Sequence, residues 1–288
     1  MTEYPLTVMR FPCGLQMLGL PGSNVEARFL YHEIFEDELY SRHGINVQDG
    51  DTVLDVGANI GMFSTYLLRK FPHLKLFAFE PVPPIFQAMQ ANLDALPLAD
   101  TENVQLFPCG LSDACGSREI TFYPTSPANS TLFPDEKFEE ASVTVDAIRV
   151  RDVWKYDKLG FLGLLLFYPI RKKLIRDRME KMYSNGITFE ARFETISSTI
   201  NEHHLDRIDL LKIDVEGSEF MVLDGIEDKH WEAIRQAVVE VSPKHVMRID
   251  VLKQQFMDRG FRRVEVETMG HTGRVKDSQL ACNVYATR

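Results

Sequence analysis

The stretch LDVGANIG, Leu54 to Gly61, contains the first residues whose types and spacing could bind a ligand. It joins an apolar run to a helix pattern, and Gly57 and Gly61 occupy the outer positions of a dinucleotide-binding turn. Asn59 stands where such a turn has its middle glycine. Because asparagine adopts the left-handed backbone conformation readily, the tight turn survives, but a pyrophosphate fits less well. The turn therefore predicts a nucleotide-type ligand without a diphosphate at this point.

Two further features favour a nucleoside. Glu80 closes the run LFAFE, 23 residues after Gly57, where a carboxylate can accept hydrogen bonds from both hydroxyls of a ribose. Ser112 and Asp113 follow the next strand pattern, and Asp113 could accept a hydrogen bond from an adenine amine. An ordinary loop with a helix-capping aspartate explains these two residues equally well. Turn and carboxylate together predict an adenosine-type ligand.

Acidic residues follow two later strand patterns. Asp214 and Glu216 end LLKIDVEG, and Glu240 and His245 lie in VVEVSPKH. Ligands of open α/β sheets bind at the carboxyl ends of the strands, so we expect Asp214, Glu240 and His245 beside a reacting group. A buried charge at Glu240 needs a partner or a function, whereas His245 could be solvent-exposed. Glu216 and Glu219 are expected in the first turn of a helix, where acids are favourable whatever their function.

Two alternatives remain open for these polar residues. Oxygen ligands suit magnesium, but nothing in the sequence fixes a metal geometry for Asp214, Glu216 and Glu240, so we assign no metal ligand. In the loop SPANST, Ser126 to Thr131, Asn129 and Ser130 could contact a substrate, as could Glu216. A Pro- and Ser-rich connecting loop is an equally good interpretation of this stretch.

From Asp51 onward, strand and helix patterns alternate with short connections. Such alternation is typical of parallel strands with helices on both faces, so residues 51–288 predict one α/β domain. Residues 1–50 predict an N-terminal addition, a hairpin followed by an amphipathic helix or two. The predicted strands of the domain are TVLDV, LKLFAFE, VQLFPCG, RIDLLKIDV, QAVVEV, FRRVEVE and ACNVYATR.

The alternation breaks between residues 146 and 191, which predicts an insertion. It holds an apolar run at 159–170 and then RKKLIRDRMEKMY, a basic amphipathic helix pattern. A lid over the binding site, presenting Arg171, Lys172 and Lys173 to an anionic group, is our preferred interpretation. Contact of residues 159–181 with a membrane surface, docking to a carrier domain, and a helix packed on the sheet are the alternatives.

Composition excludes several classes of protein. The net charge of −10 argues against nucleic-acid binding as the main function. The longest apolar run has 12 residues, too few to span a bilayer, and the first residues lack the pattern of a secretion signal. The four scattered cysteines contain no CxxC spacing and are expected to be reduced thiols. We therefore expect a cytoplasmic globular protein.

Three segments carry a resemblance to a known family. DTVLDVGANIGMFSTYLL, AFEPVPPIFQAMQANL and IDLLKIDVEGSEFMVLDGI resemble, in the same order, the signature segments of FkbM-type S-adenosylmethionine-dependent methyltransferases. The resemblance runs from about Tyr31 to Arg288 apart from the central interval, and is nearest to the domains of nonribosomal peptide and polyketide biosynthesis. It implies a class I, Rossmann-like methyltransferase sheet of seven strands, the last antiparallel, and methyl transfer usually to oxygen.

The resemblance also implies roles for individual residues. It places the methionine half of the donor against the turn, the ribose against Glu80, and the adenine near Ser112 and Asp113. The motif DVEGSE begins at Asp214, which is expected to contact the donor's amino group or the acceptor. The residues matched to the donor turn are Asp55, Gly57, Asn59 and Gly61.

The expected reaction is O-methylation of a hydroxyl on a small, apolar secondary metabolite, free or carrier-bound, with S-adenosylhomocysteine as product. The alternatives are methylation of a sugar or glycolipid hydroxyl, a nucleoside-binding module without turnover, and an NAD-dependent oxidoreductase, which the missing middle glycine disfavours. The sequence leaves open the acceptor, the regiochemistry, transfer to nitrogen or carbon, and the oligomeric state.

Overall fold

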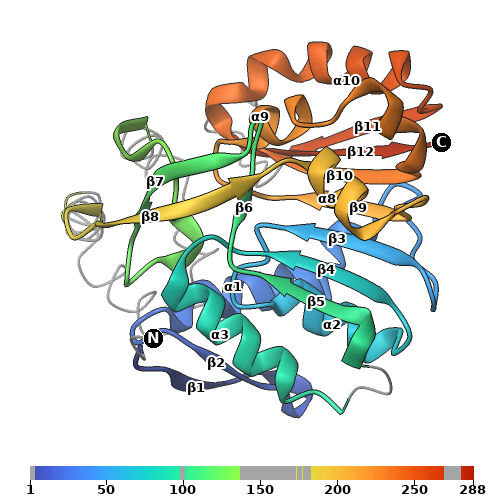
Figure 1. The fold of residues 1–288 in the computed structure, drawn as a ribbon. Coiled ribbons are helices and arrows are strands. Elements are labelled where there is room, and N and C mark those ends of the chain that lie inside the picture. The colour runs from blue at the N-terminus through green and yellow to red at the C-terminus, as the bar shows by residue number, and fades with distance from the viewer. Residues whose placement is uncertain (1–3, 98–100, 137–172, 174–176, 178–182, 269–279) are drawn as a thin grey trace.

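A seven-stranded sheet forms the centre of the computed structural model, which describes residues 4–97, 101–136, 173, 177, 183–268 and 280–288 (Figure 1). The strand order is β5-β4-β3-β9-β10-β12-β11. The first five are parallel, and β12 runs antiparallel to both β10 and β11. The predicted class I methyltransferase sheet is thereby confirmed. The strands are β3 (Thr52–Val56), β4 (Lys75–Phe79), β5 (Val104–Phe107), β9 (Leu210–Ile213), β10 (Gln236–Val241), β11 (Arg263–Thr268) and β12 (Cys282–Thr287).

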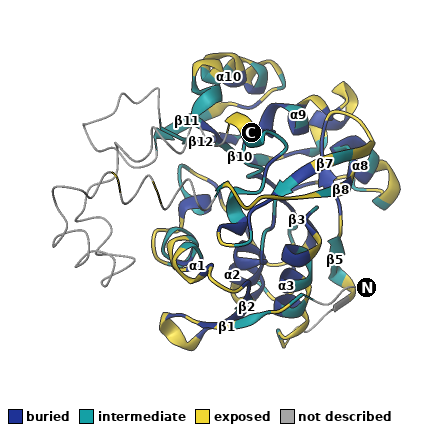
Figure 2. Ribbon diagram, turned by 90° about the vertical axis from the view of Figure 1, so that its left-hand side faces the viewer, coloured by how far each residue is buried: buried dark blue, intermediate teal, exposed yellow. Residues whose placement is uncertain are grey.

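Helices cover both faces of this sheet because its strands are apolar on both sides. Leu54 and Val56 belong to one buried cluster and Val53 to the other, as expected when successive side chains point to opposite faces. Figure 2 shows the central strands buried, whereas α10 exposes much of its surface. One face is covered by α1 (Asn24–Tyr31), α2 (Met62–Lys70) and α3 (Pro83–Asp94), the other by α8 (Ile196–His203), α9 (Glu219–Asp224) and α10 (Ile249–Asp258).

The N-terminal addition contains the predicted hairpin, β1 (Thr7–Arg10) and β2 (Gln16–Gly19). The helix pattern after it is divided into α1, one π-helical turn η2 (His32–Glu36) and a 3₁₀ turn η3 (Leu39–Ser41). The remaining short turns are η1 (Pro12–Gly14), η4 (Thr101–Asn103), η5 (Pro127–Asn129), η7 (Asp228–Ala233) and η8 (Pro243–Arg248).

A second, three-stranded sheet was not predicted. It consists of β6 (Gly110–Leu111), β8 (Ile187–Glu194) and β7 (Gly116–Phe122), with β8 in the middle, and lies to one side of the main sheet in Figure 1. Residues 187–191, which the sequence analysis assigned to the insertion, therefore belong to a strand. Residues 146–172, 174–176 and 178–182 lie outside the described residues, so the roles considered for the insertion, including membrane contact through 159–181, stay predictions.

Two other expectations concern the cysteines and membrane-spanning helices. All four cysteines lie in the described part of the chain and are free thiols. Among the helices within the described ranges, none is long and apolar enough to cross a membrane.

Asn92 of α3 connects the hairpin to the donor turn. Its Oδ1 accepts a hydrogen bond from Leu18 N–H at 2.6 Å, and its Nδ2 donates to Leu18 O at 2.9 Å and to Ile60 O at 2.8 Å. The side chain is buried, so its loss leaves backbone groups without partners. We expect Asn92→Leu to lower the free energy of unfolding by about 2–3 kcal/mol, measured by urea denaturation.

The matched control is Gln87→Leu on the same helix. Gln87 also makes two hydrogen bonds to one backbone residue, Tyr4, but at a less buried position near the chain end. We expect a smaller loss for this variant. Equal losses for both variants would contradict a special role for Asn92.

Candidate active site

A cavity of about 260 Å³ opens at the carboxyl ends of β3, β4, β9 and β10. The donor turn and the end of β4 form one wall, and the ends of β9 and β10 form another. Helix α1, η2 and the loop 127–132 complete it. It brings together eight of the residues predicted from the sequence: Gly57, Asn59, Glu80, Asn129, Ser130, Asp214, Glu216 and Glu240.

The donor turn has the predicted left-handed backbone. Gly57, Asn59 and Gly61 have φ angles of 76°, 53° and 79°. A Cβ atom at Gly57 would lie 1.8 Å from the carbonyl oxygen of Asp214, and one at Gly61 would lie 3.1 Å from Cγ of Met89. These glycines therefore allow close packing against the neighbouring strand and helix, in addition to shaping the turn.

Glu80 lies directly behind the turn. Its Oε2 accepts a hydrogen bond from Asn59 N–H at 3.1 Å and its Oε1 accepts one from Val82 N–H at 2.9 Å. Burial raises the pKa of Glu80 to about 7, although these two hydrogen bonds oppose the shift. A ligand diol donating to this carboxylate would stabilise its charged form.

A buried lysine, which the sequence analysis did not single out, connects the turn to β9. Lys212 Nζ lies 3.1 Å from Asp55 Oδ1 and 3.6 Å from Asp214 Oδ2, and it donates a hydrogen bond to Gly57 O at 2.9 Å. Burial alone lowers the pKa of Lys212, but the charges of Asp55 and Asp214 outweigh it, so the pKa lies above its usual value. Asp55, whose Oδ2 also accepts a hydrogen bond from Ser64, does not line the cavity; its carboxylate holds Lys212.

Tyr40, which also lines the cavity, bridges two acids. Its hydroxyl lies 3.0 Å from Asp214 Oδ2 and 3.3 Å from Glu240 Oε2. Burial, together with the charges of Asp214, Glu33 and Glu216, raises the pKa of Glu240 well above its usual range. Burial and the neighbouring acids likewise raise the pKa of Tyr40. The Tyr40 hydroxyl and the two carboxyl groups thus form one hydrogen-bonded cluster, and side chains of these types can serve in general acid–base chemistry.

The structure does not bring His245 to the cavity. Its Nδ1 lies 3.2 Å from Oε2 of Glu219, which is 1% exposed. The other oxygen of Glu219 accepts hydrogen bonds from Ser242 Oγ at 3.0 Å and Gly217 N–H at 2.6 Å. Glu219 therefore orders the turn before α9. Glu216 precedes that helix, with a left-handed φ of 49°, and does not lie in its first turn.

Ser112 and Asp113 lie just beyond the described lining of the cavity, which includes Gly110 and Leu111. Ser112 is fully buried and donates a hydrogen bond to Asp113 Oδ1 at 2.9 Å. Arg118 also donates to this oxygen, at 2.6 Å. The adenine-side role of Ser112 and Asp113 stays a prediction.

Asn129 and Ser130 line the cavity, but their side chains also hold their own loop. Ser130 Oγ donates to Pro127 O at 2.7 Å. Glu26 of α1, which the sequence analysis missed, accepts hydrogen bonds from Ser126 Oγ at 2.9 Å, Ala128 N–H at 3.1 Å and Asn129 Nδ2 at 3.3 Å. The loop is therefore fastened to α1.

No three His, Cys, Asp or Glu side chains of the described residues form a group that could hold a metal ion. This applies to Asp214, Glu216 and Glu240, which are all described.

Glu26 generates a prediction about pH. Burial raises its pKa from 4.5 to about 7, so the folded chain binds this proton more tightly than the unfolded chain does. The stability that it contributes is present below pH 4.5 and is lost as the pH rises toward 7, a change of about 3 kcal/mol. Glu26→Gln should remove this loss and be more stable, relative to wild type, at pH 8 than at pH 4.5.

Urea denaturation at the two pH values measures the difference. The control is Glu232→Gln, an exposed position, for which we expect the same difference at both pH values. A Glu26→Gln variant that keeps the wild-type pH dependence would show that Glu26 is not its source.

Comparison with known proteins agrees with this geometry. Residues 171–263 match the Methyltransferase FkbM domain. The chain is 35% identical to Methyltransferase sdnD of Sordaria araneosa over 83% of each chain. It is 38% identical to 31-O-demethyl-FK506 methyltransferase FkbM of Streptomyces tacrolimicus over 75% of each chain. It is also 36% identical to AMB antimetabolite synthetase AmbE of Pseudomonas aeruginosa, over 87% of this chain but 11% of that protein. The chain therefore belongs to the FkbM family of methyltransferases.

Proposed function

We propose that this methyltransferase transfers the methyl group of S-adenosylmethionine to a hydroxyl group of a small, largely apolar metabolite. The observation that carries the proposal is one cavity lined by both a nucleoside-type turn and the neighbouring cluster of Tyr40, Asp214 and Glu240.

The donor end fits this cofactor. The left-handed turn at Gly57, Asn59 and Gly61 suits a ligand without a diphosphate, and the buried Glu80 carboxylate suits a ribose diol. The turn would hold the methionine half and Glu80 the ribose. Bound there, S-adenosylmethionine would supply an electrophilic methyl carbon.

The acceptor end favours a hydroxyl. Methylation of a hydroxyl exchanges its O–H bond for an O–CH₃ bond and releases one proton. The carboxyl groups of Asp214 and Glu240 line the cavity, and the Tyr40 hydroxyl lies within hydrogen-bond distance of both, so this cluster could take up the released proton. A base of this kind contributes about 10²–10⁴-fold to such a transfer. A module that only bound a nucleoside would have no use for the cluster.

Charge also selects against an anionic acceptor. Asp214, Glu33 and Glu216 line the cavity, together with three acids whose pKa values are raised by burial, Glu26, Glu80 and Glu240. Lys212 is the one basic side chain among its described lining residues, and it is already paired with Asp55 and Asp214. A carboxylate or phosphate acceptor would be repelled here, whereas a neutral hydroxyl would not.

The walls favour an acceptor with apolar surface. The apolar side chains that line the cavity include Phe29, Ile34, Phe63, Leu132 and Phe193. The names of two relatives are consistent with a secondary metabolite: one is a 31-O-demethyl-FK506 methyltransferase and another an antimetabolite synthetase. In the synthetase the similar segment covers 11% of the length, so an acceptor attached to a carrier is part of the proposal. A cytoplasmic location and no nucleic-acid partner remain predictions.

Glu240→Gln tests the chemistry. Binding of S-adenosylhomocysteine is measured by calorimetry, and turnover with tritiated donor on a panel of apolar alcohols, phenols and carboxylic acids. We expect wild type to bind at micromolar strength, about −8 kcal/mol, and to methylate a hydroxyl compound. Because Glu240 lies at the acceptor end, the variant should bind equally well but turn over about 100-fold more slowly.

The control is Glu227→Gln, an exposed acid paired with Lys229, which should leave both measurements unchanged. Failure of wild type to bind S-adenosylhomocysteine would overturn the donor assignment. Turnover of carboxylic acids alone, or full activity of Glu240→Gln, would overturn the acceptor assignment.

A further inference from the structure

We propose that Glu267, on the edge strand β11, is a positioning residue for Tyr40. By binding Arg42 and His43 it fixes the strap, which we define as residues 37–44, and so fixes the hydrogen bonds of Tyr40 with Asp214 and Glu240. This inference rests on the function proposed above, because it concerns the same acid cluster.

The backbone of the strap is strained on both sides of Tyr40. Glu38 and His43 have left-handed φ angles of 46° and 53°, and Gly44 has 95°. Residues with side chains rarely adopt this conformation, and it persists where surrounding contacts enforce it. The position of Tyr40 therefore depends on the side chains that hold the strap.

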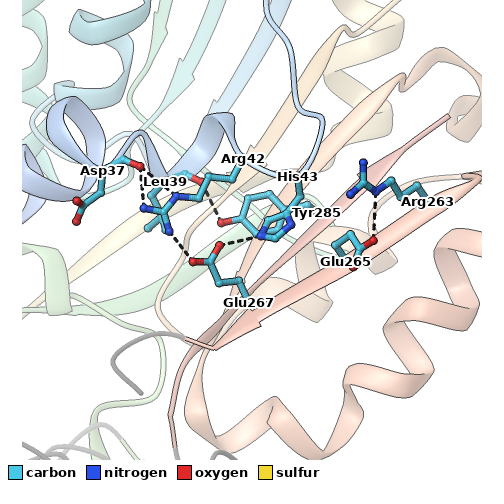
Figure 3. Close-up of polar contacts among 8 residues, drawn as sticks. All are labelled: Asp37, Leu39, Arg42, His43, Arg263, Glu265, Glu267 and Tyr285. Atoms are coloured by element: carbon cyan, nitrogen blue, oxygen red, sulfur yellow. Dashed lines mark hydrogen bonds and ion pairs between the residues drawn. The ribbon is translucent and has the colours of Figure 1, made fainter. Parts of the chain in front are cut away.

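Glu267 provides two of those contacts, as Figure 3 shows. Its Oε1 lies 2.5 Å from Arg42 Nη1 and its Oε2 lies 2.9 Å from His43 Nε2. Arg42 in turn donates from Nε and Nη2 to Asp37 O, at 3.0 and 2.8 Å, which closes the strap on itself. The Glu267 carboxylate thus binds two consecutive residues, Arg42 and His43, which follow Tyr40 by two and three positions.

Tyr285 of β12 adds a third contact. Its hydroxyl donates a hydrogen bond to Leu39 O at 2.9 Å, and its ring lies 4.7 Å from that of His43 (Figure 3). Leu39 directly precedes Tyr40, so this hydrogen bond holds the backbone beside the tyrosine. The strap is fastened at both ends of a five-residue stretch, Leu39 to His43.

The register of the sheet relates Glu267 to Glu240, which lines the cavity. Glu240 pairs with Asn283 across β10 and β12, and Asn283 pairs with Glu267 across β12 and β11. Directly paired residues lie on the same face of a sheet, so these three form one row. The strap runs along this row, with Tyr40 at the Glu240 end and Arg42 and His43 at the Glu267 end.

The donor end of the cavity has other supports. The turn and Glu80 are held by β3, β4 and Lys212, and Glu267 reaches Lys212 only indirectly, through Tyr40 and the Asp214 carboxylate that Tyr40 shares with Lys212. Loss of the contacts that Glu267 makes with Arg42 and His43 should therefore impair the chemical step more than donor binding. A role in general stability would lower both together.

The test compares Glu267→Gln with the matched control Glu265→Gln. Glu265 lies on the same strand and carries the same charge, but it pairs with Arg263 at 3.2 Å (Figure 3). Tyrosine labelled with ¹³C at Cζ reports on Tyr40 by NMR, with the signal assigned from Tyr40→Phe. Calorimetry with S-adenosylhomocysteine and turnover of the best hydroxyl compound of the panel complete the set.

For Glu267→Gln we expect a shifted Tyr40 signal, an unchanged affinity for S-adenosylhomocysteine, and a kcat lower by about 10- to 100-fold. Glu265→Gln should match wild type in all three. If Glu267→Gln does not fold, Tyr285→Phe removes the Leu39 hydrogen bond alone and should shift the same signal.

An unshifted Tyr40 signal in folded Glu267→Gln, or equal changes in Glu267→Gln and Glu265→Gln, would overturn the proposal; if Glu267→Gln does not fold, an unshifted signal in Tyr285→Phe would do so. Failure of the proposed function would appear differently, as wild-type protein that neither binds S-adenosylhomocysteine nor methylates any compound. The NMR comparison would still decide whether Glu267 positions Tyr40.

Discussion

The buried ammonium group of Lys212 is the interaction on which the site depends. It sits between β3 and β9, where Asp55 and Lys212 are direct neighbours in the parallel register, and it joins Asp55, Asp214 and the carbonyl oxygen of Gly57. A buried cation is tolerated only with such partners, and the fully buried carboxylate of Asp55 needs the cation in return. The ammonium group of Lys212 therefore holds both the donor turn, through Gly57, and Asp214.

Around this cation the cavity is assembled from two parts of the chain. The α/β domain supplies the turn, Glu80 and the acids at the strand ends, whereas the N-terminal addition supplies Glu26, Glu33 and Tyr40. The addition is therefore a wall of the reaction site. After burial and Asp214, the charge of Glu33 is the next cause that raises the pKa of Glu240, so the addition also influences a residue 200 positions away from Tyr40.

Local patterns made part of this predictable. The Asn59 turn, the position of Glu80 and the alternation of strands with helices follow from short segments, because turn chemistry and strand and helix patterns are local properties. Tyr40 and Glu26 gave no such signal, since their roles arise from packing between distant segments. Lys212 did leave one: a charged residue inside the apolar strand LLKI. His245 was misplaced because the η8 turn directs its ring to Glu219, and β8 was missed although ITFEARFE alternates with a period of two.

The most direct test of this account is the stability of Lys212→Met, measured by urea denaturation beside Asp55→Asn/Lys212→Met and the exposed control Lys229→Met. The account predicts that the single variant loses about 3–5 kcal/mol, because it leaves Asp55 buried without its cation. The double variant should regain part of this loss, and the control should lose almost nothing. A Lys212→Met protein as stable as wild type would contradict the central role of the buried cation.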